Sequence, residues 1–265
     1  MGLFTPYSFL QQKVAEAAPS SPYAYRTDAY SSYLKLAIPG STFTGLITDA
    51  YDDVHADIAG TGTNFQYNLT GSASEIFLDT DVKWAAEDYA TSIYAQDAGS
   101  WGGILDSEMP FSNSNFCVEG WVYMDERFTK PPYWKVGLRQ TNYRIDLDFG
   151  FPGSGTTDMR GRIILNDTQF FSSNLNISYN LNQWYHVAWV RSGSNLYFYW
   201  NGTRYSCGTS TLTVTANGYY RIFTGENSTN DGTMGSYQDF RVYIGTEKGY
   251  TTSTITTPNS IVEKL

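Results

Sequence analysis

The stretch NQWYHVAWVRSGSNLYFYWNGT, residues 182–203, constrains the fold more than any other part of the sequence. Apolar and aromatic residues occupy both odd and even positions between Trp184 and Arg191, so an extended strand here would be covered on both faces. Turn-forming residues at 191–195 separate this run from a second aromatic run, and an Asn-Gly turn follows that one. The stretch therefore predicts a hairpin with a broad apolar face.

Short runs of the same kind continue along the chain from about Tyr30, separated by turn residues. In chain order they read SYLKLAIPG, NFQYNLTG, SEIFLDTD, NFCVEGWVYM, YWKVGLRQ, YRIDLDFG, GRIILND, QWYHVAWVRSG, NLYFYWNGT, TLTVTANG, YRIFTGEN and YQDFRVYIG. This succession predicts an all-β protein, a sandwich or jelly roll of two antiparallel sheets. One helical interruption is predicted at KWAAEDYATSIY, residues 83–94, although its β-branched end weakens helix propensity.

Residues 1–22 differ from the rest of the chain and are called the N-terminal arm. Thr5 and Pro6 suit the start of a helix, and apolar residues then recur at helical spacing until the linker APSSP at 18–22. We expect a short helical docking arm and linker, followed by a jelly-roll domain over residues 23–265. The arm residues predicted to be buried against a partner are Phe4, Tyr7, Phe9, Leu10 and Val14.

Charge and hydropathy exclude several classes of partner. The net charge is −9 and the 17 Lys and Arg residues are scattered, so no electrostatic footprint for nucleic acid is present. No run approaches 18 consecutive apolar residues, so we expect no membrane insertion, and the opening MGLFTPYSFLQQK lacks the pattern of a signal peptide. Cys117 and Cys207 have no zinc-site spacing, and free thiols are expected for a product of the cytoplasm.

Three stretches in order, FCVEGWVYMDE at 116–126, residues 182–203 and GSYQDFRVYIGTEKGYTT at 235–252, carry a family resemblance. Together they resemble the laminin-G-like branch of the concanavalin A-like lectin/glucanase jelly rolls. The matching positions are Phe116, Glu119, Trp121 to Tyr123, Trp184 to Arg191, Asn201, Gly202 and Asp239 to Tyr243. The resemblance implies the jelly-roll fold over roughly residues 30–260. It also implies that His186 is a packed wall residue of its sheet rather than a catalytic group.

An enzyme of this fold would need acidic residues at fixed spacing. The resembling glucanases use an E-x-D-x-x-E strand for nucleophile and acid. Asp146 and Asp148 approach that pattern, but Phe151 stands where the last acid belongs. The acids of SEIFLDTD, at 74–81, fail the spacing too, no G-x-S-x-G serine motif exists, and His55 is interpreted as a solvated loop residue. We expect no enzymatic activity.

The loop GENSTNDG, residues 225–232, gathers oxygen donors of the kind that Ca²⁺ prefers. Related jelly rolls hold Ca²⁺ at one rim, so Glu226, Asn230 and Asp231 are candidate calcium ligands, with a solvated turn as the alternative. No other cofactor is indicated. If the domain binds a sugar, no recognisable sequence motif identifies the residues that would contact it.

The arm followed by a single jelly roll also resembles virion proteins of tailed bacteriophages, particularly those of marine phages. That resemblance implies a non-enzymatic virion structural protein, assembled in the host cytoplasm, whose arm docks on other capsid or tail proteins. The jelly roll would then face outward as capsid decoration or as a tail adhesin touching host surface glycans, with several copies forming a homo-oligomer on the particle. A free carbohydrate-binding lectin and a glycoside hydrolase of the same fold remain the alternatives.

Overall fold

A computed structural model of the chain describes residues 28–38, 66–69, 76–79, 83, 92–95, 100–105, 109–124, 134–140, 144–150, 159–176, 179–215, 219–222 and 235–259. The N-terminal arm, His55 and the candidate calcium loop at 225–232 lie outside these ranges.

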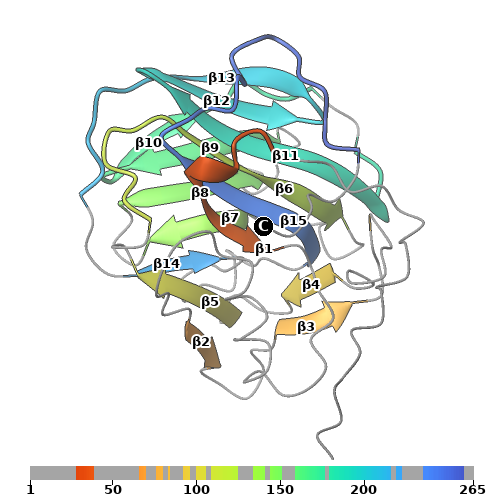
Figure 1. Ribbon diagram of the computed structural model, residues 1–265. Helices are drawn as coiled ribbons and strands as arrows, with labels where there is room; N and C mark the ends of the chain where they lie inside the picture. Colours follow the sequence, from red (N-terminus) through yellow and green to blue (C-terminus); the bar gives the residue numbers. More distant parts are fainter. Residues whose placement is uncertain are drawn as a thin grey trace, which may run out of the picture.

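Two antiparallel sheets stack face to face to form the domain (Figure 1). The eight-stranded sheet runs in the order β13-β12-β11-β6-β15-β4-β3, with β1 also paired to β15; the seven-stranded sheet runs β10-β9-β8-β7-β14-β5-β2. A short 3₁₀ helix, η1 (Ser31–Tyr33), precedes β1. The strands are β1 (Leu34–Ile38), β2 (Gln66–Leu69), β3 (Ile76–Asp79), β4 (Ser92–Ala95), β5 (Ser100–Leu105), β6 (Phe116–Met124), β7 (Trp134–Gln140), β8 (Ile145–Gly150), β9 (Arg160–Leu165), β10 (Thr168–Phe171), β11 (Gln183–Ser192), β12 (Asn195–Trp200), β13 (Thr203–Thr209), β14 (Tyr219–Ile222) and β15 (Gly235–Ile244).

Strand β11 crosses the middle of the eight-stranded sheet and is buried on both faces, as its sequence predicts. It pairs with β6 along its whole length and with β12 through the hairpin turn at 193–194. Its odd-numbered side chains, including Trp189, point into the core between the sheets. The even-numbered ones, including Ala188 and Val190, belong to a second cluster on the outer face. The alternation of β11 thus fixes which residues of the neighbouring strands share each face.

The core between the sheets is closely packed and rich in aromatic rings. Trp189 is fully buried, and its indole N–H donates a hydrogen bond to the carbonyl of Asp148 in the other sheet at 2.9 Å. Phe198 of β12 stacks on Phe149 of β8, with ring centroids 6.0 Å apart. Gly161 of β9 leaves the space that the Phe198 ring fills, because a Cβ there would stand 2.1 Å from Cγ of Phe198. The two sheets therefore pack closely, because the Phe198 ring of one sheet occupies the space that a side chain at Gly161 of the other would need.

A second apolar cluster covers the outer face of the eight-stranded sheet. Its buried members are Leu34, Cys117, Ala188, Val190, Tyr199 and Tyr243. Besides Tyr197 of β12, the partly buried side chains that pack on it come from two stretches: residues 28–33, called the N-terminal segment, and residues 245–257, called the C-terminal segment. The described stretches nearest the two chain ends therefore meet on the same face of the same sheet.

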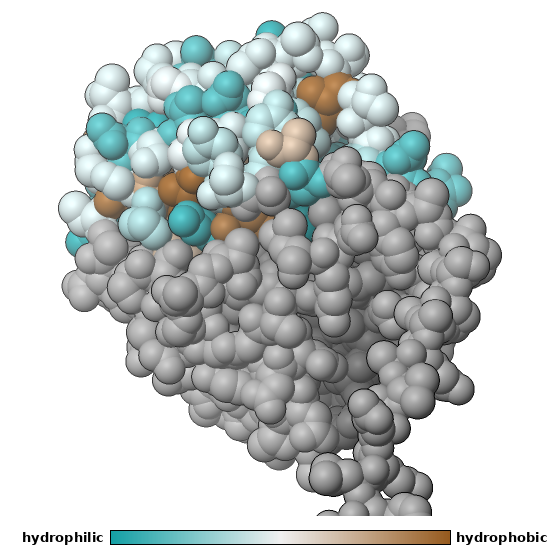
Figure 2. Space-filling view, viewed as in Figure 1, coloured by the Kyte–Doolittle hydropathy of each residue, from teal (hydrophilic) through white to brown (hydrophobic). Residues whose placement is uncertain are grey.

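The visible face of the described part is mixed in polarity. Figure 2 shows its coloured residues as mostly pale or teal, with brown residues in a few small groups. Among all the described residues, the large hydrophobic side chains that are exposed are Tyr33 and Phe171. No helix among the described residues is long and apolar enough to cross a membrane.

The predicted all-β fold of two antiparallel sheets is confirmed, and most predicted runs coincide with strands. Two predictions were wrong. Residues 92–94, placed at the end of a helix, lie in β4, because Ile93 and Tyr94 pair across to β3 and β15. Residues 211–215, predicted as a strand, have no strand structure although Val214 is buried. Strands β5 and β13 were missed, since glycine, serine and threonine dilute their apolar pattern. Strand β10 was missed because it has four residues and is mostly exposed.

The two cysteines are free thiols, as predicted, and they lie in different clusters. Cys117 belongs to the outer-face cluster and Cys207 to the core between the sheets, so they lie on opposite faces of the eight-stranded sheet. Burial raises the pKa of both thiols, and the nearby Glu119 carboxylate raises that of Cys117 further.

Both thiols should therefore stay protonated and unreactive in the folded protein at pH 8. Alkylation with iodoacetamide, followed by mass spectrometry, should label neither cysteine until denaturant is added. Labelling of Cys117 before Cys207 would indicate that the outer-face cluster opens before the core. Rapid labelling of Cys207 without denaturant would contradict its burial in the core.

Candidate functional site

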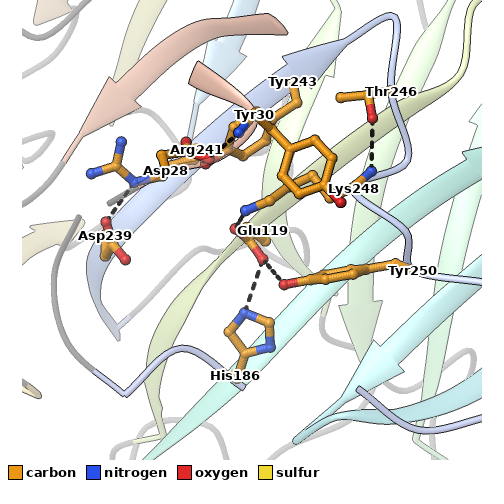
Figure 3. A network of polar contacts seen from close by, with 10 residues as sticks. All are labelled: Asp28, Tyr30, Glu119, His186, Asp239, Arg241, Tyr243, Thr246, Lys248 and Tyr250. Carbon is orange, nitrogen blue, oxygen red and sulfur yellow. Dashed lines mark hydrogen bonds and ion pairs between the residues drawn. The ribbon is translucent and has the colours of Figure 1, made fainter. Parts of the chain in front are cut away.

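A network of charged and polar side chains lies buried on the outer face of the eight-stranded sheet (Figure 3). Its members come from β6, β11 and β15 and from the two segments that cover this face: Asp28, Tyr30, Glu119, His186, Asp239, Arg241, Tyr243, Thr246, Lys248 and Tyr250. Buried ionisable groups are costly unless they are paired, so such a concentration marks a place of structural or functional importance.

Glu119 of β6 stands at the centre of this network. Its side chain is 1% exposed, and Lys248 Nζ lies 2.5 Å from Oε1. The hydroxyl of Tyr250 donates to Oε2 at 2.7 Å. Both partners belong to the C-terminal segment, 129 and 131 residues further along the chain. One buried carboxylate therefore fastens this segment to the sheet.

His186 stands beside Glu119 on the neighbouring strand β11 and is fully buried. Its Nε2 lies 3.4 Å from Glu119 Oε2, without hydrogen-bond geometry. The imidazole and the Trp121 ring pack in an edge-to-face manner, with ring centroids 5.4 Å apart. Its backbone N–H donates to the side chain of Asn201 at 2.8 Å. The structure places His186 in the packed wall, as the resemblance implied.

The N-terminal segment joins the network through Asp28. Its carboxylate accepts a hydrogen bond from the Tyr243 hydroxyl at 2.6 Å and another from the backbone N–H of Tyr30 at 2.8 Å. Burial and the charge of Glu119 raise the pKa of Tyr243, so this hydroxyl remains a donor. Asp28 thus holds the start of the described domain against β15.

A bulge in β15 accommodates a second buried ion pair. The register shifts between Gln238 and Arg241, and Asp239 takes up a left-handed backbone conformation with φ of 51°. Arg241 Nε donates to Asp239 Oδ1 at 2.7 Å. Burial alone lowers the pKa of Arg241, but the Asp239 carboxylate and Tyr243 outweigh it and raise that pKa. The guanidinium is therefore permanently charged and fixed to its own strand.

Further along, the C-terminal segment is tied to the hairpin of β12 and β13. The Tyr199 hydroxyl donates to the carbonyl of Thr252 at 3.0 Å, and the N–H of Ile255 donates to the carbonyl of Gly202 at 2.8 Å. Burial raises the pKa of Tyr199 to about 12. Gly202 is required here, because its φ is +81° and a Cβ would stand 2.5 Å from the carbonyl oxygen of Ile255.

The two acids weighed as glucanase candidates lie on the other sheet. Asp146 and Asp148 point to the outer face of the seven-stranded sheet and are fully buried. Asp148 accepts two hydrogen bonds from Arg162 of β9, one of them from Nε at 2.8 Å. Its carboxylate is therefore committed to a bidentate ion pair. Asp146 does not join the Glu119 network.

The arm residues and Glu226, Asn230 and Asp231 lie outside the described ranges. Within those ranges, no three His, Cys, Asp or Glu side chains come together as a metal-binding group.

Comparison with known proteins identifies the fold family. A family profile described as the Concanavalin A-like lectin/glucanases superfamily matches residues 99–246, more than half of the chain. The chain belongs to this superfamily. Among curated proteins, no sequence matches it.

Solved structures show the same superfamily fold at low sequence identity. Domain 4 of AbnA, a GH43 extracellular arabinanase from Geobacillus stearothermophilus solved with arabinotriose, has a TM-score of 0.54 and 15% identity, covering 82% of this chain and 98% of that one. The binding domain of botulinum neurotoxin DC with rat synaptotagmin II has a TM-score of 0.52 and 10% identity, covering 81% and 49%. A botulinum neurotoxin type C structure, whose description concerns cell entry that depends on two ganglioside molecules, has a TM-score of 0.51 and 11% identity. The match covers 81% of this chain and 48% of that one. The chain spans about half of each neurotoxin chain.

In this superfamily member, sequence reasoning found part of the network. Glu119 and His186 lie in the strands that carry the resemblance, and they were interpreted as framework. Lys248 and Tyr250 were missed, although GTEKGYTT directly follows the last of those strands. An isolated lysine, two residues before a tyrosine and just after a closing strand, was the available signal. The network itself has one clear chemical effect, which is to hold two chain segments on one sheet face.

Proposed function

We propose that this chain is a non-enzymatic virion structural protein of a tailed bacteriophage. The N-terminal arm anchors it to other capsid or tail proteins, and the jelly roll is displayed at the particle surface. There it serves as decoration or as a host-adhesion module that contacts surface glycans. The protein is assembled in the host cytoplasm and is present in several copies on each particle, without nucleic acid or membrane insertion.

The observation that carries this proposal is the placement of the N-terminal segment. Asp28 and Tyr30 are held on the outer face of the eight-stranded sheet by the Glu119 network. From residue 22 to Asp28 the chain can reach about 20 Å at most. The arm therefore begins within that distance of the face that also carries the C-terminal segment. That side faces the particle, and the seven-stranded sheet lies on the side turned away from it.

The ion pairs and hydrogen bonds made by the buried carboxylates favour a binding module over an enzyme. Glycosidases need one carboxyl group that can give up a proton and a second that is free to act as nucleophile or base. Asp148 is committed to Arg162, and Glu119 is committed to Lys248 and Tyr250. Both carboxylates therefore hold other parts of the structure in place. Glycan contact, as in the arabinotriose-bound neighbour, needs neither of them.

Deletion of residues 1–22 tests the anchoring role. The truncated protein should remain folded, with the melting temperature of the full chain, because the Glu119 network begins at Asp28. It should no longer be incorporated when particles are assembled in its presence. The measurement is the amount of protein that co-sediments with purified particles, compared with the full chain.

A matched control replaces Phe9 and Leu10 by serine in the full-length chain, which keeps its length but removes apolar area that we expect to be buried. This variant should lose incorporation as the deletion does. Normal incorporation of the deletion variant would show that the arm is not the anchor. Unfolding of that variant would show that the arm belongs to the domain.

A further inference from the structure

The ammonium group of Lys248 lies among three tyrosine rings. Its Nζ is 4.1 Å from the ring centre of Tyr243, 5.7 Å from that of Tyr250 and 5.9 Å from that of Tyr30. These rings come from β15, the C-terminal segment and the N-terminal segment. Glu119 closes the arrangement with its Oε1 at 2.5 Å from the same nitrogen (Figure 3). We call these four residues the tyrosine cage.

The tyrosine cage has the two features that bind organic cations. Aromatic faces attract a cation within about 6 Å, and more strongly when water is excluded. A carboxylate adds a charge-assisted hydrogen bond, which an N–H donor can use and a fully methylated nitrogen cannot. Lys248 is only 7% exposed and Glu119 1% exposed, so the interaction is largely shielded from solvent. The site is assembled around the cation by three parts of the chain that are distant in sequence.

We propose that the tyrosine cage is a binding site for a primary alkylammonium ion, which the protein fills with its own Lys248. The lysine acts as an internal ligand that closes the C-terminal segment over the sheet. Once the lysine side chain is removed, the same cage accepts a free primary amine in its protonated form. The ligand class is set by the cage: a single positive charge, an N–H donor for Glu119 and a short alkyl chain.

The Lys248→Ala variant tests this proposal with n-propylammonium chloride, which replaces the atoms from Cγ to Nζ that the substitution removes. Without ligand, the variant should melt below the wild type, because Glu119 loses its cationic partner. Added n-propylammonium should raise the melting temperature in a saturable manner, with half-saturation on the order of 1 mM. Beyond that point each tenfold increase in concentration should add roughly 2 to 3 °C.

Four controls separate cage binding from general effects of the additive. The wild type, whose cage is filled, should show no saturable rise. Equal concentrations of sodium chloride or 1-propanol should not stabilise Lys248→Ala as n-propylammonium does, because neither supplies an alkyl chain carrying an N–H cation. The double variant Glu119→Gln with Lys248→Ala should lose most of the response, since the carboxylate is gone. Tetramethylammonium, which has no N–H, should act more weakly than n-propylammonium.

If Lys248→Ala does not fold alone, the yield of refolding from denaturant gives the same answer. A higher yield with n-propylammonium than with sodium chloride supports the proposal. Equal yields, or equal melting shifts with n-propylammonium and sodium chloride, would overturn it. A rise of the same size in the wild type would overturn it as well, because the cage is already occupied there.

Discussion

Replacement of Glu119 by glutamine is expected to lower the free energy of unfolding by about 3 to 5 kcal/mol, the usual cost of removing one partner from a buried ion pair. Glutamine has nearly the same shape as glutamate and can still accept a hydrogen bond from Tyr250. The loss of stability therefore measures the effect of removing the negative charge. Lys248, 7% exposed, would be left without its anion. Two-state denaturant unfolding followed by tryptophan fluorescence measures the change.

Two comparisons show whether burial causes this cost. Asp167→Asn removes the same kind of charge from the pair with Arg144, whose side chains are 38% and 64% exposed, and should cost at most about 1 kcal/mol. The double variant Glu119→Gln with Lys248→Met removes both charges and should be more stable than Glu119→Gln alone. If all three variants unfold at the denaturant concentration of the wild type, Glu119 does not fasten the C-terminal segment.

Replacement of Gly161 by alanine is expected to cost about 3 kcal/mol, at the upper end for overpacking a core. The new Cβ would stand 2.1 Å from Cγ of Phe198 and 2.5 Å from its Cβ. Phe198 cannot move aside easily, because Phe149 stacks on its ring and Trp189 lies 5.7 Å away. Thermal unfolding of the purified variant measures the cost.

Gly193→Ala is the matched control, because its added Cβ meets nothing within 4 Å. Its φ of +58° still penalises alanine, so a cost of about 1 to 2 kcal/mol is expected from backbone strain alone. Phe198→Leu combined with Gly161→Ala should recover part of the lost stability by making room for the methyl group. Equal losses at Gly161 and Gly193 would show that the clash is relieved and that the sheets are less tightly interlocked than described.

The strands that the sequence predicted best are those with strong apolar patterns. In β11 the aromatic residues on both faces correctly indicated a strand in the middle of a sheet, and the turn after Arg191 located its hairpin. In β13 the pattern is broken by Ser206 and Gly208, because this strand lies at the edge of its sheet and only part of it is buried. Edge strands carry less of the hydrophobic signal on which such predictions depend.

The Glu119 network was less accessible from sequence for a different reason. Glu119 and Lys248 meet only because β6 and β15 are neighbours in the sheet. Local hydrophobic periodicity does not show which strands pair when they lie far apart in the chain. A buried glutamate and an exposed one have the same sequence signature. The face of the strand could be deduced, since Cys117, Glu119 and Trp121 alternate with apolar core residues. The partner could not.

Counting the copies of this chain in purified particles tests the central proposal most directly. Quantitative mass spectrometry can compare its peptides with those of the major shell protein, before and after a high-salt wash that removes loosely held proteins. The account predicts a fixed ratio that matches a symmetry of the shell or the tail and survives the wash. Absence of the chain from the particles, or a variable trace that the wash removes, would contradict its role as an anchored virion protein.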